Sequence, residues 1–234
     1  TVFLPFNQGS NGAGKDGGAG NPTTEDGKYV TSYFWENVLQ KDKLLDILQK
    51  FISYERSEKK KIMPDGSTKT TVSSKVIFPR YHQLDVVRKL VSHVRENGAG
   101  HNYLIQHSAG SGKSNSIAWT AYRMASLHDE NNNPIFDSVI IVTDRRVLDQ
   151  QLQATVSGFD HTLGSVVTID EKKNSGDLRD AINDGKRIII STLQKFPVIY
   201  DEVHSSVGKH YAVIVDEAHS SQTGQSALKL KAAL

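Results

Sequence analysis

The stretch that most constrains the fold is Tyr103–Ser114, which reads YLIQHSAGSGKS. An apolar run leads into a loop that contains Gly110 and Gly112, and a helix-compatible segment follows. Strand, loop and helix in this order are the context of a phosphate-binding P-loop, in which backbone N–H groups and a helix N-terminus surround phosphate oxygens. We predict that Lys113 contacts the outer phosphates of a nucleotide and that Ser114 ligates Mg²⁺. The predicted nucleotide contacts of this loop are Ser108, Ala109, Gly110, Ser111, Gly112, Lys113 and Ser114.

The loop departs from the full P-loop pattern at one position, because His107 stands where the first glycine is expected. The segment Gly9–Lys15 matches the bare spacing better. However, Asp16 follows its lysine, where a hydroxyl should hold Mg²⁺ and where a carboxylate would repel phosphate. The glycines and the proline of residues 17–22 cannot begin a helix, so the helix dipole is missing. We therefore interpret the earlier segment as a flexible linker and assign the phosphate site to the later loop.

Downstream of Phe78, apolar runs alternate with segments of helical periodicity. Several of these runs are continuously apolar, as expected for strands that are covered on both faces. This alternation predicts an α/β fold with a parallel sheet, right-handed crossovers and ligands at the carboxyl ends of the strands. The predicted strands are Tyr103–Gln106, Ser138–Thr143, Ser165–Ile169, Arg187–Thr192 and Tyr211–Asp216, and the predicted helices are Tyr81–Glu96, Ser114–Leu127, Arg146–Ser157, Asp177–Asp184 and Gln194–Tyr200.

The N-terminal third of the chain follows a different pattern. Apolar residues at helical spacing predict an amphipathic helix over Asn37–Tyr54. A turn between two extended stretches, Lys59–Met63 and Lys69–Phe78, predicts a β-hairpin. We therefore divide the chain into residues 1–77, a linker region with a Gly-rich loop, a helix and a hairpin, and residues 78–234, the nucleotide-binding part.

Composition excludes several classes of protein. The 234 residues contain no cysteine, so a disulfide framework and thiolate metal sites are excluded, and a reducing compartment is expected. No apolar run approaches the ~20 residues needed to span a bilayer, and we expect no membrane association. The formal net charge of +2 is too small to predict nucleic-acid binding by itself.

A second motif lies in Ala212–His219, which reads AVIVDEAH. Ionised carboxylates beside a core are costly, and a nucleotide with Mg²⁺ provides a reason for them. Asp216 is predicted to hold the metal, and Glu217 to orient and deprotonate the attacking water, while Lys113 neutralises developing charge. The plain alternative is an acidic first turn of a helix, which the helix dipole favours. Two such motifs, with three apolar strands between them, make coincidence much less probable.

The segment Asp216–His219 resembles the motif II box of superfamily 2 helicases and translocases. Phe78–Asp85, just ahead of the P-loop region, resembles the adenine-recognising Q motif of that superfamily. The resemblance implies that the amide of Gln83 reads adenine, which it can do through N6 and N7; a surface helical glutamine is the alternative. It also implies that His219 couples the ATP state to the DNA-facing parts, whereas a structural histidine is the plain interpretation.

Four segments together resemble the R subunit (HsdR) of type I restriction–modification enzymes, a family in which a histidine usually stands at the place of His107. These segments are residues 107–114, 142–146, 190–196 and 215–222, and residues 3–7, 18–22 and 31–35 resemble the region that joins the nuclease of that family to its motor. The resemblance implies the first RecA-like lobe of a motor that uses ATP and Mg²⁺ on double-stranded DNA, in the cytoplasm of a bacterium or archaeon. Methyltransferase and specificity subunits are the implied partners, with a nuclease domain before Thr1 and a second lobe after Leu234.

By the same resemblance, the residues after two strand ends face the DNA backbone. Backbone N–H groups, hydroxyls and guanidinium groups suit phosphate contacts that read no sequence. A surface charge cluster at a helix start is the alternative for the two arginines. Two other functions stay open: a nucleotide-binding or subunit-interaction fragment without activity of its own, and a superfamily 2 ATPase that acts on RNA. The implied DNA contacts are Thr143, Arg145, Arg146 and Thr192.

Overall fold

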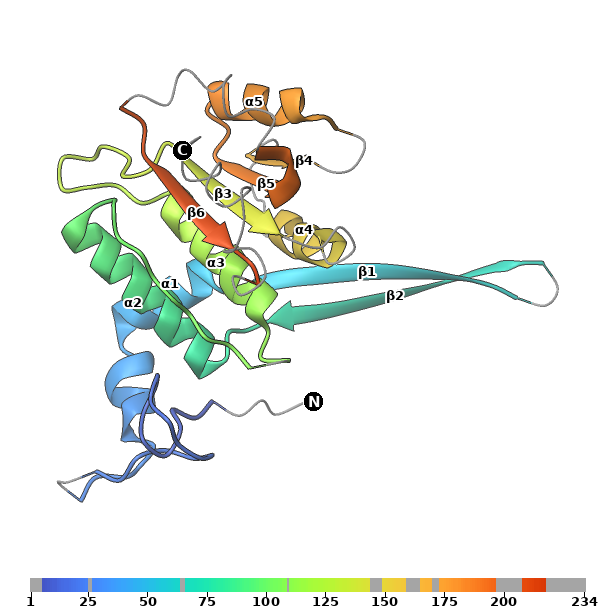
Figure 1. The fold of residues 1–234 in the computed structure, drawn as a ribbon. Helices are drawn as coiled ribbons and strands as arrows, with labels where there is room; N and C mark the ends of the chain where they lie inside the picture. The colour runs from blue at the N-terminus through green and yellow to red at the C-terminus, as the bar shows by residue number, and fades with distance from the viewer. Residues whose placement is uncertain are drawn as a thin grey trace. The chain divides into compact units, whose positions relative to one another are not determined.

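The computed structural model describes residues 6–24, 27–63, 66–108, 110–143, 149–158, 165–169, 173–196 and 208–217 (Figure 1). The chain divides into two compact units, residues 1–85 and residues 86–234. Within the described ranges, no helix is both long and apolar enough to cross a membrane.

The first unit contains a short π-helix, η1 (Phe34–Val38), and the α-helix α1 (Lys41–Lys50). The predicted helix over residues 37–54 is therefore wrong at both ends. Ile47 and Phe51 are fully buried and hold the helical turn in place. Ser53 and Tyr54 instead pair with Ile77 and Val76 in a sheet, so strand pairing overrides the helical periodicity there.

The predicted β-hairpin is confirmed. Strand β1 (Ser53–Ile62) pairs antiparallel with β2 (Thr68–Ile77), and the register runs from Ser53 opposite Ile77 to Ile62 opposite Thr68. The first strand begins earlier than the predicted Lys59, directly after α1.

The Gly-rich segment near the N-terminus forms a closed loop of turns. The Gly9 N–H donates to the Gly20 carbonyl at 2.9 Å, and the Ser10 N–H donates to the Gly18 carbonyl at 3.0 Å. A Cβ on Gly17 would lie 2.8 Å from the Asn11 nitrogen, so the loop packs closely on itself. The described residues 6–24 contain no helix after Lys15, so the helix N-terminus that a phosphate-binding loop needs is missing from this segment.

Aromatic rings join the chain after the N-terminus to the start of α2 (Tyr81–Asn97). The Phe6 ring lies 5.5 Å from that of Tyr81 and 5.8 Å from that of Phe34, in edge-to-face geometry. The Tyr33 hydroxyl donates to the Phe6 carbonyl. Edge-to-face pairs of this kind contribute about 0.5–1.5 kcal/mol each beyond their burial, so they hold these segments together.

The second unit is an α/β structure with a four-stranded parallel sheet in the order β4–β5–β3–β6 (Figure 1), as predicted. Helix α3 packs against β3, β5 and β6, and α5 packs against β4 and β5. The strands are β3 (Ser138–Thr143), β4 (Val166–Ile169), β5 (Ile188–Thr192) and β6 (Tyr211–Val215), and the helices are α3 (Lys113–Ala125), α4 (Asp149–Gly158), α5 (Ser175–Asn183) and the 3-10 turn η2 (Leu193–Lys195).

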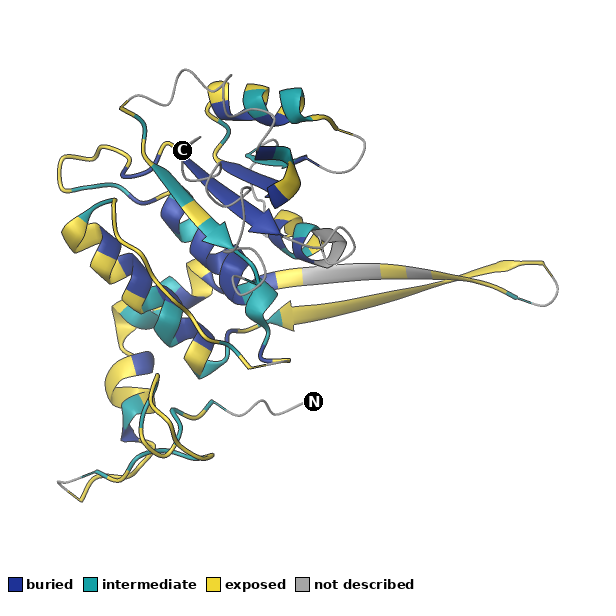
Figure 2. Ribbon diagram, viewed as in Figure 1, coloured by how far each residue is buried: buried dark blue, intermediate teal, exposed yellow. Residues whose placement is uncertain are grey.

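The core of this unit lies around its two central strands. Every residue of β3 and β5 is buried, as Figure 2 shows by the dark strands at the centre of the sheet. Full burial of an isoleucine such as Ile140 or Ile189 contributes roughly 1.5–3 kcal/mol. This burial holds the carboxyl ends of these two strands in fixed positions.

The predicted strand Tyr103–Gln106 does not form. Residues 101–108 have no strand pairing, and Leu104 is 89 % exposed. Side-chain contacts with α2 account for the difference: the Tyr103 hydroxyl bonds to His93 Nδ1 at 2.8 Å, and the His93 ring also packs on His101. These contacts hold Tyr103 against α2, and the segment does not join the sheet.

The predicted helix over Gln194–Tyr200 is represented by η2, and residues after Phe196 lie outside the described ranges. The side chain of Lys195 anchors this short turn, because its ammonium group donates to the carbonyls of Ile169 at 2.8 Å and Lys173 at 3.0 Å. The turn therefore covers the carboxyl end of β4.

Candidate nucleotide-binding site

The site lies at the carboxyl edge of the sheet, where three strands end side by side. Thr192 of β5 is directly opposite Thr143 of β3, and Val142 is opposite Val215 of β6. The Asp216 N–H continues this ladder with a 2.9 Å bond to the Val142 carbonyl. Asp216 is thereby fixed beside the end of β3, which is where parallel α/β sheets bind ligands.

The glycines of the predicted P-loop have the backbone conformation that the motif requires. Gly110 and Gly112 have φ of +72° and +83°, in the left-handed region that favours glycine. Gly112 precedes the first residue of α3, and no side chain caps that helix N-terminus. The N–H groups of Asn115 and Ser116 donate to the Gly112 carbonyl, whereas those of the first two helical residues have no acceptor four residues back and can serve phosphate oxygens.

His107 has a role that the sequence did not reveal. Its Nδ1 lies 3.2 Å from the hydroxyl of Ser111, across the loop. Ser111 is buried, and its N–H also donates to the Ser108 carbonyl at 3.2 Å. A side-chain bond across the loop therefore braces it at the place where the full motif has glycine. The only signal in the sequence is the four-residue spacing of the two polar side chains.

Lys113 joins the two motifs that the sequence singled out. Its ammonium group lies 2.9 Å from Asp216 Oδ1 and also bonds to Glu217 Oε1. Partial burial by itself would lower the pKa of Lys113, but hydrogen bonds and charges of Glu217 and Asp216 outweigh it, and the pKa is raised. The structure thus brings together the three predicted catalytic residues, although Lys113 lies 104 positions before Glu217 in the sequence.

Glu217 has an unusual backbone. Its φ is +53°, a left-handed conformation that is costly for a residue with a side chain, and its N–H donates to Asp216 Oδ1 at 3.0 Å. Strained backbone of this kind concentrates at functional sites. Here it turns the Glu217 carboxylate back toward Lys113.

The donor set suits Mg²⁺, which prefers hard oxygen ligands. Asp216 supplies a carboxylate that is 15 % exposed, and Ser114 supplies a hydroxyl in the first turn of α3. The described residues contain no cluster of three or more acidic, histidine or cysteine side chains that could hold a metal unaided. Mg²⁺ commonly binds through one or two carboxylates together with substrate phosphates, and this edge of the sheet fits that arrangement.

Gln83 is buried in the first turn of α2, where its Oε1 accepts a 2.8 Å bond from the Arg80 N–H. This contact is one half of a capping box, in which a Glu or Gln three residues into a helix reaches back to the residue that precedes it. Gln83 belongs to the first compact unit and the P-loop to the second. Gln83 therefore has a structural role at the start of α2, and its contact with adenine stays a prediction.

The predicted DNA contacts differ in what the structure says of them. Thr143 and Thr192 lie side by side, and both are buried. Among the residues that the structure describes, the Thr143 hydroxyl has no hydrogen-bond partner, which is uncommon for a buried polar group. Contacts of these residues with DNA stay a prediction. The other sequence-predicted residues of the site, Ala109, Arg145, Arg146 and His219, lie outside the described ranges.

Comparison with known protein families identifies the family of this chain. Residues 82–234 match the family described as SWI2/SNF2 ATPase. The matched range covers more than half of the chain and includes the P-loop, the parallel sheet and both carboxylates of the site. A comparison with curated proteins gave no match.

Proposed function

The chain belongs to the SWI2/SNF2 ATPase family, and on that premise we propose that it supplies the ATP-binding lobe of a motor that translocates double-stranded DNA. The finer proposal is that this motor is the R subunit of a type I restriction–modification enzyme. Residues 78–234 would form the first RecA-like lobe, and residues 1–77 the link to a nuclease domain. Methyltransferase and specificity subunits would be the partners.

The observation that carries the proposal is the cluster of Lys113, Asp216 and Glu217. An ammonium group from the start of α3 contacts two carboxylates from the end of β6. This is the arrangement needed to bind phosphates on one side and to activate water on the other. For the R subunit in particular, the support is the resemblance of the four motif segments. His107 adds to it, because this histidine stands at the position of the first P-loop glycine and bonds to Ser111.

The mechanism is phosphoryl transfer from ATP to water. Lys113 moves from the carboxylates to the outer phosphates, where its charge stabilises the charge that develops on the transferred group. The hydrogen bond from Lys113 to Glu217 is then broken, and the Glu217 carboxylate can accept a proton from the attacking water. Ser114 and Asp216 would hold Mg²⁺, which supplies further neutralisation of phosphate charge.

The test of this mechanism is the substitution Glu217→Gln in the complete natural protein, with ATPase activity measured in the presence of duplex DNA and the partner subunits. We expect ATP binding to stay within about twofold of wild type and turnover to fall at least a hundredfold, because general bases contribute about 10²–10⁴ in rate. Full turnover in this variant would contradict the role of Glu217.

The choice of nucleic acid is tested with the same protein. We expect duplex DNA to stimulate ATP hydrolysis and RNA of the same sequence to have no effect. Stimulation by RNA alone would contradict the DNA motor and favour the RNA-dependent ATPase. The Asp16→Ser variant serves as the control for the measured ATP hydrolysis. Residue 16 lies in the loop that we exclude from the site, so this variant should hydrolyse ATP like wild type.

A further inference from the structure

The β1–β2 hairpin has a surface that the proposed ATP chemistry does not use. All residues of β2 from Thr68 to Val76 are exposed, and Ile77 alone is half-buried; Figure 2 shows this strand in yellow along its length. Ten residues per strand give a ribbon of roughly 30 Å. A two-stranded hairpin with little burial is marginally stable by itself, so the core does not explain its length.

The two faces of β2 differ in chemistry, because side chains alternate along a strand. One face carries Val72 and Val76, which are 49 % and 62 % exposed. The opposite face carries only ammonium and hydroxyl groups among the residues of β2 before Ile77. We call it the cationic hairpin face, and its members are Lys61 of β1 with Lys69, Thr71 and Ser73 of β2; farther from the turn, the register places Glu55 of β1 opposite Lys75.

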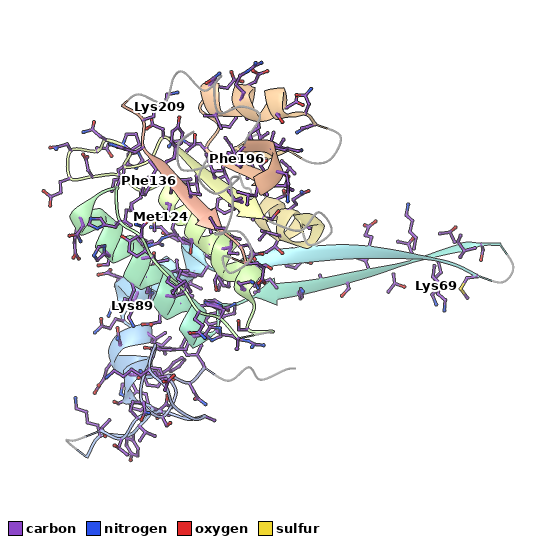
Figure 3. All side chains as sticks on the ribbon, in the orientation of Figure 1. Lys69, Lys89, Met124, Phe136, Phe196 and Lys209 are labelled. Carbon is purple, nitrogen blue, oxygen red and sulfur yellow. The ribbon has the colours of Figure 1, made fainter. Side chains whose placement is uncertain are left out.

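Two of these lysines repel each other. Lys61 is directly opposite Lys69, so their side chains share one face, and both are exposed. Figure 3 shows Lys69 toward the far end of the hairpin. The ion pairs among the residues that the structure describes include neither lysine. Like charges directly opposite each other destabilise a strand pair.

Positive charge is concentrated around the turn that joins β1 to β2. Residues 59–69 contain four lysines and one acidic residue, Asp65, which lies outside the described ranges, whereas the whole chain has a net charge of only +2. Protection of exposed strands against aggregation is the ordinary role of such lysines. Single lysines on each strand achieve that protection, however, and an opposed pair adds repulsion without adding protection.

We propose that the cationic hairpin face binds the phosphate backbone of duplex DNA. This inference rests on the proposed DNA motor and extends it to the first compact unit. A polyanion across the two strands would remove the repulsion between Lys61 and Lys69. Ammonium and hydroxyl groups contact phosphate oxygens without reading sequence, as a translocating motor requires.

The chemistry of this face favours a duplex over a single strand. Proteins that bind single strands use aromatic side chains as stacking platforms. The described residues of the cationic hairpin face include no aromatic side chain, and Tyr54, the aromatic residue of β1, pairs with Val76 on the opposite face. The stretch from Lys69 to Ser73 covers about 13 Å, which is long enough to meet more than one phosphate of one strand.

The test uses the full 234-residue chain and a fluorescein-labelled 30-base-pair duplex of arbitrary sequence, with fluorescence anisotropy measured from 50 to 200 mM NaCl. The variant Lys61→Gln/Lys69→Gln is compared with Lys41→Gln/Lys50→Gln, which removes two exposed lysines from α1. We expect the hairpin variant to bind about tenfold more weakly at 100 mM NaCl. The slope of log K against log[salt] should shrink by about one unit per lysine removed. The α1 variant should bind like wild type.

Failure to fold is not a ready explanation for such a loss. Removal of an opposed like-charge pair relieves repulsion, so the hairpin variant should unfold at the same or a higher denaturant concentration than wild type. Equal duplex binding by the hairpin variant and wild type would overturn the proposal, as would an equal loss in both variants or no binding by wild type. Hairpin-dependent binding of single-stranded RNA or polyglutamate in preference to the duplex would also overturn it.

The proposal and the proposed motor fail in different ways. The hairpin variant should bind a fluorescent ATP analogue like wild type, because its lysines are not part of the nucleotide site. Normal ATP hydrolysis with unchanged duplex binding in the hairpin variant would reject the hairpin contact alone. Hairpin-dependent duplex binding without any DNA-stimulated hydrolysis by the complete protein would reject the motor and keep the contact.

Discussion

At the scale of single residues, the charge of Lys113 links the P-loop to the acidic strand end. Asp216 and Glu217 raise its pKa above the ordinary value of 10.5 against the opposing effect of burial. A raised lysine pKa means that the Lys113 ammonium group is fully charged below pH 10.5 and that its stabilising contribution is lost as pH rises through the higher folded value. The charge of this residue is therefore constant across neutral pH, so the pH dependence of hydrolysis should come from other groups.

Gln83 has a structural contact and a predicted adenine contact, and two substitutions separate them. Gln83→Ala removes the acceptor for the Arg80 N–H and should lower the free energy of unfolding by about 1 kcal/mol. Gln83→Glu keeps that acceptor and suits the positive end of the helix dipole, so stability should stay near wild type. The carboxylate cannot donate to adenine N7, and ATP affinity should fall.

The measurements are urea denaturation and titration with a fluorescent ATP analogue. Unchanged ATP affinity in the Gln83→Glu variant would leave Gln83 with a capping role only. A matched loss of stability in both variants would show that the Arg80 contact depends on the amide itself.

At the scale of elements, the bounds predicted from the sequence agree best with the structure where a strand is completely buried. The strand over Ser138–Thr143 has the predicted bounds, because six consecutive buried positions leave little freedom. Prediction failed where side chains from elsewhere decide the outcome. Residues 103–106 are apolar enough for a strand, but contacts to His93 hold them along α2, and no periodicity could reveal that.

The same limit applies to the site. The positions of Lys113, Asp216 and Glu217 at one place followed from two motifs and the rule for parallel sheets. The brace between His107 and Ser111 and the left-handed backbone of Glu217 did not follow, because both depend on loop geometry that residue types do not specify.

The connection between α3 and β3 contains a loop that Asp129 organises. Its Oδ1 accepts from the N–H groups of Asn131 at 2.9 Å and Asn133 at 2.8 Å. The Asn133 backbone hydrogen bond is the largest cause of the lowered pKa of Asp129. Asp129→Ala should accelerate hydrogen exchange of both amides, whereas Asp129→Asn, which keeps an acceptor oxygen, should accelerate it less.

The pH dependence of this loop has a definite sign. Because the pKa of Asp129 lies below its ordinary value of 3.8, the loop keeps its full stabilisation above that value and loses it as pH falls through the lowered pKa. NMR-detected exchange and carboxyl titration measure both effects. Equal exchange rates in wild type and Asp129→Ala would show that the backbone bonds alone hold the loop.

At the scale of the whole molecule, two glycine-rich loops resemble the sequence pattern of a phosphate-binding loop. The loop at residues 9–15 has the better spacing, yet turns and internal hydrogen bonds close it, and no helix begins in the described residues 16–24 that follow it. The loop at residues 107–114 has one departure from the pattern, yet it precedes α3 and places its lysine on two carboxylates. Context beyond the motif thus decides which lysine meets phosphate.

The central claim is that Lys113, and not Lys15, binds the phosphates of ATP. The most direct measurement is titration of the chain with a fluorescent ATP analogue in the presence of Mg²⁺, for wild type, Lys113→Ala and Lys15→Ala. The account predicts that Lys113→Ala abolishes binding and that Lys15→Ala binds like wild type. Binding that survives Lys113→Ala, or that is lost in Lys15→Ala alone, would contradict it.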